Sequence, residues 1–443
     1  MAELIFRGGT IVTLDDDHHV VAGDLAIRDG LIVQVGGAYT PATSDYTIVD
    51  ASGCVVLPGL VQAHVHTCQT LARGRADDLE LLDWLERVVW PYEGALDAAA
   101  ARAAARLAMA ELLLGGTTAI LDMATVHHTD EVFAAADEAG IRATIGKAMM
   151  DAPHPAIPPG LRETTAASLD ESARLATRWH GAGGGRLRYA YAPRFVLSCT
   201  DELLREVGVR ARAGGYGVHT HSSENRAEIA AVEARYGKRN VLALHDLGLT
   251  GEHVGLAHCV HLSDAEIDVL AATGTHVLHC PSSNLKLASG VALVPELIAR
   301  GVRVALGADG APCNNNLDGF LELRLAAILH KPRVGPRALP APQALHLATR
   351  AGAAALGESD RIGALTVGRR GDAIAVDLGG VHVVPSERPF SALAYACRAS
   401  DVRHVAVDGA LVVRDRTLLT MDLGQVLADA RHHAHQVAVR AGL

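Results

Sequence analysis

Eight short, nearly all-apolar runs alternate with long helical stretches through most of this 443-residue chain. Strands buried on both faces have this composition, because helices cover both sides of a parallel sheet. Eight such strands within about 300 residues match the number that a (β/α)8 barrel requires. The predicted strands are residues 55–63, 117–123, 143–149, 187–195, 217–220, 254–257, 275–278 and 302–307.

Both ends of the chain carry a different pattern, in which short alternating strands are separated by turns rich in Gly and Asp. This pattern is typical of a small antiparallel sheet. We therefore predict one small β-sandwich domain built from residues 1–56 and 361–443, beside a catalytic barrel domain over residues 57–360. The expected fold class is α/β, a TIM barrel with a β-sandwich domain formed by both termini.

The composition excludes several other classes of protein. Hydrophobic residues make up 49% of the chain and charged residues 20%, so the chain has enough apolar surface to fold. It has no apolar run of about 18 residues and no basic cluster, and its net charge is −10, so we expect neither a membrane span nor binding to nucleic acid. The first residues lack the features of an export signal and the seven cysteines form no C-x-x-C pair, so we expect a cytoplasmic protein with reduced thiols.

Histidine and aspartate end several of the predicted strands. His64 and His66 close the first strand, and their spacing puts both imidazoles on one face. Such a pair is weak evidence alone, but four later strands end in 219-HTHSSEN-225, 257-AHCVH-261, 278-LHCPSSN-284 and 306-LGADGAPCNNN-316. Because the carboxyl ends of barrel strands share one mouth, and unpaired buried His and Asp are costly, these residues predict a metal site with a position open for water.

On these motifs the chain resembles the amidohydrolase superfamily, in its branch of mononuclear metal-dependent deaminases, over nearly its whole length. His221 is preferred to His219 as a ligand because 221-HSSE-224 matches the His-x-x-Glu pattern of the family. The resemblance also implies one metal, since two-metal members carry a bridging lysine at the end of the fourth strand, where this chain has Arg194. Zinc is expected on the resemblance, and the ligand types are also compatible with iron. The ligands that it implies are His64, His66, His221, His258 and Asp309.

These residues can carry out a hydrolysis. A bound divalent ion lowers the pKa of its water, and Asp309 can accept the proton released. Glu224 can protonate a ring nitrogen and later pass a proton to a departing amine, and His279 can stabilise the attacking or product oxygen. Attack on an sp2 carbon that bears an amino group then releases ammonia, so the predicted reaction class is hydrolytic deamination.

Candidate substrate contacts follow the first, third and fourth strands. Trp84, grouped with other aromatics after the first strand, can form the wall that a flat heterocycle needs. In similar enzymes acting on adenosine derivatives, the carboxylate at the position of Glu93 grips vicinal ribose hydroxyls; the alternative is that Glu93 caps the helix starting near residue 95. Lys147 is expected to orient the substrate or to act as a structural cation. Arg194 and Phe195 resemble the pair that holds the purine in guanine deaminase.

Several stretches look most like deaminases of 5'-deoxyadenosine, methylthioadenosine and S-adenosylhomocysteine, namely residues 122–129, 146–151, 159–165, 193–200 and 307–318. We therefore predict a deaminase that removes the 6-amino group of 5'-modified adenosines. The alternatives are a deaminase of guanine or another aminopurine, an aminotriazine deaminase or chlorohydrolase, and, from another class, an inactive barrel scaffold. The expected partner is a small heterocyclic amine or nucleoside, and members of this branch are often homo-oligomers.

Overall fold

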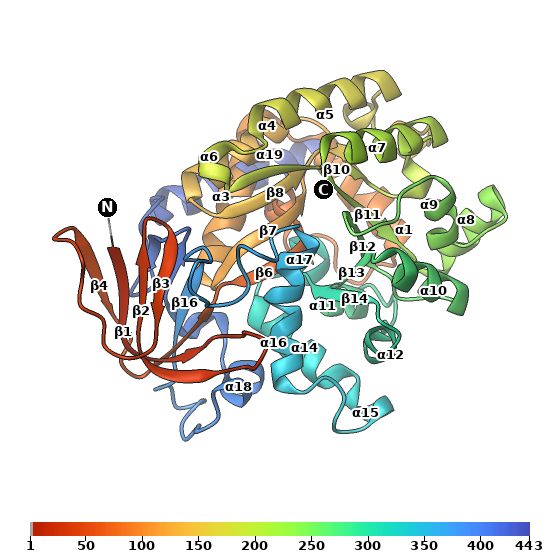
Figure 1. Cartoon of the computed structure of the whole chain (residues 1–443). Coiled ribbons are helices and arrows are strands. Elements are labelled where there is room, and N and C mark those ends of the chain that lie inside the picture. The colour runs from red at the N-terminus through yellow and green to blue at the C-terminus, as the bar shows by residue number, and fades with distance from the viewer. Residues whose placement is uncertain (1–2) are drawn as a thin grey trace.

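The computed structural model describes residues 3–443 as a parallel barrel beside a mixed sheet (Figure 1). Every pair of neighbouring barrel strands is parallel, and the barrel closes where Asp309 of the last strand pairs with Val65 of the first. Two short strands, β14 and β15, together form the eighth position, so the predicted (β/α)8 barrel is confirmed. In barrel order the strands are β6 (Leu60–His66), β7 (Thr117–Met123), β8 (Arg142–Gly146), β10 (Leu187–Pro193), β11 (Gly217–Ser222), β12 (Val254–His258), β13 (His276–His279), β14 (Arg303–Leu306) and β15 (Asp309–Gly310).

The helices that cover the barrel begin and end at residues suited to those positions. The side chains of Asp97, Thr164 and Thr200 each accept a hydrogen bond from the first turn of the helix that follows. Left-handed glycines such as Gly215 and Gly274 end two helices, where a side chain would be strained. The main covering helices are α3 (Ala98–Leu114), α4 (Thr129–Ala139), α5 (Thr165–Trp179), α7 (Asp201–Gly214), α8 (Arg226–Tyr236), α10 (Asp264–Thr273) and α14 (Gly319–Leu329).

The apolar run over residues 55–63, which we predicted as one strand, is divided between two sheets. β5 (Cys54–Pro58) pairs with β1 (Glu3–Val12) and β16 (Ala373–Asp377), whereas β6 starts the barrel. Gly59 makes the crossing possible, because a Cβ atom there would lie only 2.0 Å from Thr118 Oγ1. Apolar composition cannot show the division, since both halves are fully buried.

The second sheet combines both ends of the chain, as predicted. Most of its pairs are antiparallel, but β1 runs parallel to β4 and β5, which an alternating pattern does not reveal. Its core includes the fully buried side chains of Phe6, Leu25 and Ala375. The remaining strands are β2 (Val20–Arg28), β3 (Leu31–Val35), β4 (Tyr46–Asp50), β17 (Val402–Val407), β18 (Ala410–Arg414) and β19 (Thr417–Leu418).

Two contacts fasten the terminal segments to the barrel. Arg142, at the start of β8, is almost fully buried and donates to both carboxylate oxygens of Asp372, at 2.9 and 3.0 Å. The last helix, α19 (Leu423–Ala441), packs against α3, and Asp429 pairs with Arg106 at 3.1 Å. Across residues 3–443, no helix combines the length and apolar character that a membrane span requires.

Candidate active site

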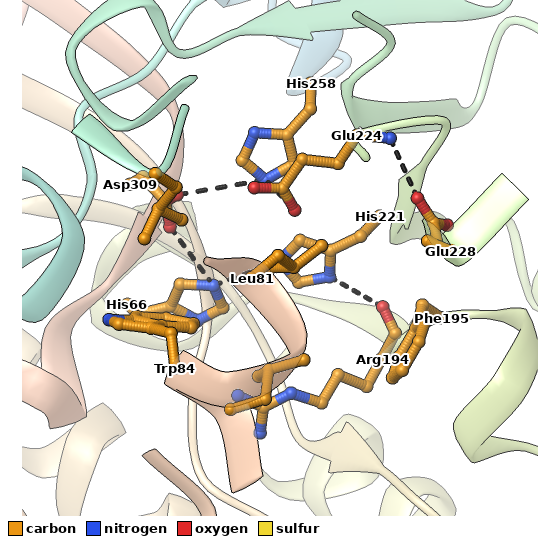
Figure 2. A pocket seen from close by; sticks show the side chains of 12 residues that line it. His66, Leu81, Trp84, Arg194, Phe195, His221, Glu224, Glu228, His258 and Asp309 are labelled. Atoms are coloured by element: carbon orange, nitrogen blue, oxygen red, sulfur yellow. Dashed lines mark hydrogen bonds and ion pairs between the residues drawn. The ribbon is translucent and has the colours of Figure 1, made fainter. Parts of the chain in front are cut away.

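Four histidines and one aspartate meet at the carboxyl ends of the barrel strands, as the sequence predicted (Figure 2). The Nε2 atoms of His66 and His221 lie 3.2 Å apart. Asp309 Oδ1 lies 3.3 Å from His64 Nε2 and 3.4 Å from His66 Nε2, and its Oδ2 lies 3.8 Å from His258 Nε2. The structure therefore brings together one ring nitrogen from each histidine and both oxygens of the carboxylate.

The outer nitrogens of these imidazoles are occupied elsewhere. His66 Nδ1 lies 2.8 Å from the carbonyl of Met123, and His221 Nδ1 lies 2.6 Å from the carbonyl of Arg194. A carbonyl can only accept, so both Nδ1 atoms carry the proton and both Nε2 atoms present lone pairs. Two lone pairs that face each other at 3.2 Å cannot hydrogen-bond, but they can share a cation. His64 Nε2, which is buried and has no hydrogen-bond partner within residues 3–443, points to Asp309, so the donor set fits a divalent metal.

Burial sets the protonation states that such a site needs. It lowers the pKa of His66 to about 3 and holds the pKa of His221 well below its usual value, with neighbouring imidazoles adding to the effect. Burial alone would raise the pKa of Asp309, but the close contact with His64 and the charges of the neighbouring imidazoles hold it well below its usual range. Neutral imidazoles and an ionised carboxylate are the forms that bind a metal.

The backbone is strained where the strands enter this site. His258 and Asp309 both adopt left-handed φ angles, of 72° and 63°, and Ser223 does so at 55°. Non-glycine residues rarely adopt this conformation, and it clusters at functional sites in proteins. Here the left-handed conformation occurs at His258 and Asp309 themselves, and it directs their side chains into the barrel mouth.

Glu224 lies beside the donor set and is 4% exposed. Its Oε2 is 3.5 Å from His258 Nε2, and its backbone N–H donates to Glu228 Oε2 at 2.8 Å. Burial raises the pKa of Glu224 to about 7, with the positive charge of His258 opposing the shift and Asp309 adding to it. A carboxyl group with this pKa can take up or release a proton near neutral pH.

Apolar and aromatic side chains wall the pocket above these groups. Trp84, Arg194 and Phe195 line it, as predicted, and Arg194 and Phe195 lie on the side away from Glu224 and His258 (Figure 2). Four further residues line the pocket, namely Leu81, Leu85, Glu228 and Leu287, and among these the sequence analysis gave no indication of Leu81 or Glu228. Leu81 could have been found from its helical spacing to Trp84, because residues three apart share a face.

Four predicted residues lie outside the lining of this pocket within the described chain: His64, which belongs to the donor set beneath it, and Glu93, Lys147 and His279. Glu93, in α2 (Trp90–Gly94), accepts hydrogen bonds from Arg194 and Gln69, and it is Asp97 that caps α3. Lys147 contacts Glu163 and the carbonyl of Ala148, and burial lowers its pKa despite the pairing with Glu163.

His279 is the last of these four residues. It is fully buried, and burial lowers its pKa to about 3. Its ring lies 5.9 Å from that of His330, and neither ring nitrogen has a hydrogen-bond partner within residues 3–443. The imidazole of His258 instead lies near both Glu224 and Asp309.

Comparison with known proteins places this geometry in a family. The model of the amidohydrolase family matches residues 55–412. The chain belongs to the amidohydrolase family. The family predicted from the motifs is therefore confirmed, and so is the prediction that the protein is an enzyme.

Relatives of known name cover the whole chain. It is 42% identical to a 5-methylthioadenosine/S-adenosylhomocysteine deaminase of Syntrophobacter fumaroxidans, over 98% of each chain. It is 40% identical to a 5'-deoxyadenosine deaminase of Methanosarcina mazei, over 99% of each.

Solved structures agree with the fold. An adenosine deaminase from Xanthomonas campestris with bound zinc has a TM-score of 0.91 and 32% identity, covering 98% of each chain. A guanine deaminase from C. acetobutylicum with bound guanine has a TM-score of 0.83 and 25% identity, covering 92% of this chain and 99% of that one. Family, neighbours and histidine cluster together support a divalent metal at this site.

Proposed function

We propose that this amidohydrolase is a hydrolytic deaminase that removes the 6-amino group of 5'-modified adenosines such as 5'-deoxyadenosine. The observation that carries the reaction class is the position of Glu224, a buried carboxyl group 3.5 Å from His258 at the edge of a metal-donor set. The substrate class rests on the relatives, which are about 40% identical over the whole chain and carry deaminase names for such nucleosides. An inactive scaffold would have no need of this strained, buried and costly group of polar residues.

Four donors are best placed to hold the metal, which we propose is zinc. These donors are the Nε2 atoms of His64, His66 and His221 and the Oδ1 atom of Asp309. The distances are 3.2 Å between His66 and His221, 3.3 Å between His64 and Asp309, and 3.4 Å between His66 and Asp309. When bound, the ion supplies Lewis acidity, which makes water a nucleophile near neutral pH. The bound zinc of the Xanthomonas neighbour supports this choice of metal.

Proton transfer falls to Asp309 and Glu224. Asp309 has a second oxygen, Oδ2, held by Ser283 at 2.6 Å, and this carboxylate can accept the proton of the attacking water. Glu224 can hold a proton at neutral pH and deliver it to the ring nitrogen next to the reacting carbon, which makes that carbon electrophilic. A second transfer to the amino group lets ammonia leave.

His258 was predicted as a metal ligand, and we propose for it instead the role of stabilising the attacking oxygen that was predicted for His279. Its Nε2 lies between Glu224 and Asp309, 3.5 and 3.8 Å away. The pKa of His258 would fall on burial, but these two carboxylates raise it overall, so the ring can donate to the oxygen that attacks the substrate. In this arrangement His258 serves the reaction at the edge of the metal donors.

A deaminase of guanine or a related aminopurine is the second candidate. Arg194 and Phe195 line the pocket, and the family resemblance gives this pair a purine-holding role in guanine deaminase. The guanine-bound neighbour supports the same comparison.

Ammonia release by the zinc-loaded protein tests these proposals. The panel contains 5'-deoxyadenosine, methylthioadenosine, S-adenosylhomocysteine, adenosine, adenine, guanine and an aminotriazine. We expect turnover of the adenosines and none of the free bases. Turnover of guanine or the triazine alone would retain the reaction class and contradict the nucleoside assignment. Removing the metal with a chelator should abolish activity and adding zinc should restore it.

A further inference from the structure

His219 lies inside the barrel, beneath the metal donors. It is two residues before His221 in β11, so the two side chains share one face of the strand and His219 lies deeper in the barrel. The centre of its ring is 4.8 Å from that of the His64 ring, and both side chains are fully buried. A buried imidazole is costly unless its nitrogens find partners, so this position calls for a reason other than packing.

The partner of His219 is one of the proposed metal ligands. His219 Nε2 lies 2.6 Å from His64 Nδ1, and of two ring nitrogens in such a contact one carries the proton and the other accepts it. The other nitrogen of His64, Nε2, faces Asp309 at 3.3 Å and must present a lone pair to bind a cation. Nδ1 is then the protonated nitrogen of His64, so His64 donates and His219 accepts.

This hydrogen bond prevents His219 from being a ligand itself. Its Nε2 lone pair is used by His64, and its Nδ1 carries the remaining proton of the ring. Within residues 3–443, the donor atoms that approach one another closely enough to share an ion include those of His64 and His221 but not those of His219.

His64 differs from the other two histidine donors in how it is held. His66 Nδ1 and His221 Nδ1 meet the backbone carbonyls of Met123 and Arg194, which no substitution can remove. The acceptor for His64 is a side chain. An acceptor at the outer nitrogen of a ligating imidazole fixes the ring orientation and makes the inner nitrogen a stronger donor to the metal.

We propose that His219 is a positioning residue, which accepts from His64 Nδ1 and thereby holds His64 Nε2 toward the metal. This inference rests on the metal site of the proposed function. It divides the motif 219-HTH-221 into a first histidine that supports a ligand and a second that binds the ion. His219 is absent from the lining of the substrate pocket in the described chain, so its effect should reach the reaction through the ion.

Zinc affinity, measured by competition with a chromogenic chelator, tests this role without any turnover. We expect His219→Met to raise the Kd for zinc by about 10- to 100-fold, because the acceptor is lost. His219→Gln should stay within about threefold of wild type, because its Oε1 can reach the place of the imidazole Nε2 and accept the same hydrogen bond.

His276→Met is the matched control. His276 is also a buried histidine of a barrel strand, in β13, but neither of its ring nitrogens has a hydrogen-bond partner within residues 3–443. The zinc Kd of this variant should stay near wild type. If His219→Gln instead lost the ion as completely as His221→Asn, His219 would be a ligand and the positioning role would be overturned.

The same titration separates the possible failures. Equal zinc affinity of wild type and His219→Met would overturn only the role of His219. A wild-type protein that binds no zinc would overturn the donor set as well. Failure of the protein to deaminate any adenosine would contradict the proposed function and leave the zinc titration unaffected.

NMR of the zinc-loaded wild type tests the hydrogen bond directly, even if a variant does not fold. In protein labelled with 15N at histidine, the ring nitrogens that carry a proton are distinguished from those that do not. We expect a proton on His64 Nδ1 and none on His219 Nε2. A proton on His219 Nε2 would show that His219 donates to its neighbour and would overturn the proposal.

Discussion

Asn284 Oδ1 lies 2.8 Å from His258 Nδ1, on the side of the imidazole that faces away from the reacting groups. Asn284 belongs to α11 (Pro281–Lys286), the short helix after β13, and is almost fully buried. An acceptor at Nδ1 fixes the tautomer of the ring and its orientation toward Glu224.

Removing that acceptor should lower the rate without emptying the metal site. We expect Asn284→Leu to reduce kcat about 10- to 100-fold, because His258 loses its orienting partner. Metal analysis should still find the ion bound, since the proposed ligands are untouched. Asn284→Asp keeps an acceptor at this position and should retain more activity than the leucine variant; equal activity of both would contradict the orienting role.

Glu224→Gln separates proton transfer from metal binding. The amide has nearly the same shape but cannot deliver the proton, so kcat should fall by about 10² to 10⁴ with metal content unchanged. His221→Asn is the comparison, because it should lose both metal and activity. A Glu224→Gln enzyme with more than a tenth of wild-type activity would exclude Glu224 as the acid.

Glu322 should make the stability of the fold depend on pH. It is buried and accepts from Ser282 N at 3.1 Å and Asn314 Nδ2 at 2.9 Å, and burial raises its pKa from 4.5 to about 7. The folded protein thus binds the proton more tightly than the unfolded chain. This contribution is present below pH 4.5 and is lost as the pH rises through about 7, at a cost of about 3 kcal/mol.

Denaturation of wild type and Glu322→Gln across pH 5 to 8 measures this effect. The free energy of unfolding should fall more steeply with pH for the wild type, because the amide has no proton to lose. Parallel curves for the two proteins would show that Glu322 does not titrate in this range.

Arg142 should be the most sensitive link between the barrel and the terminal sheet. It donates to Asp372 and Asp408 and lies 3.5 Å from Glu358. Arg142→Met leaves the buried carboxylate of Asp372 without its cation, whereas Glu358 and Asp408 keep other arginine partners, so we expect a loss of about 3–5 kcal/mol in urea denaturation. Arg102→Met is the control, since Arg102 pairs with two partly exposed glutamates and should cost about 1 kcal/mol or less.

The sequence was sufficient for the barrel and for the convergence of His and Asp side chains at its mouth, for a physical reason. Fully apolar strands are stable mainly when they are buried between helices. Burying His64, His66 and Asp309 at the strand ends would cost free energy unless these side chains interacted with one another or with a common ligand. Those two constraints are local in the chain, so they can be identified without coordinates.

What the sequence could not predict depends on contacts between distant residues. Glu93 and Arg194 are 101 residues apart, and nothing in either local motif indicates that they pair. The same holds for His279, whose strand-end position resembles that of His258 although its ring points to His330. The division of the strand at Gly59 could not be predicted either, because the residue that leaves no room for a side chain there is Thr118, which is distant in the sequence.

The pairing of β5 with β16 has a consequence for how the protein is made. β5 leaves the ribosome before any barrel strand, but β16, which pairs with the edge of β5 that β1 does not occupy, follows the last of them. That edge of β5 therefore stays without its partner throughout synthesis of the barrel, which leaves it open to wrong pairing with other nascent chains. The sheet is consequently completed late in biosynthesis, because β5 and β16 can pair only after the whole barrel between them has been synthesised.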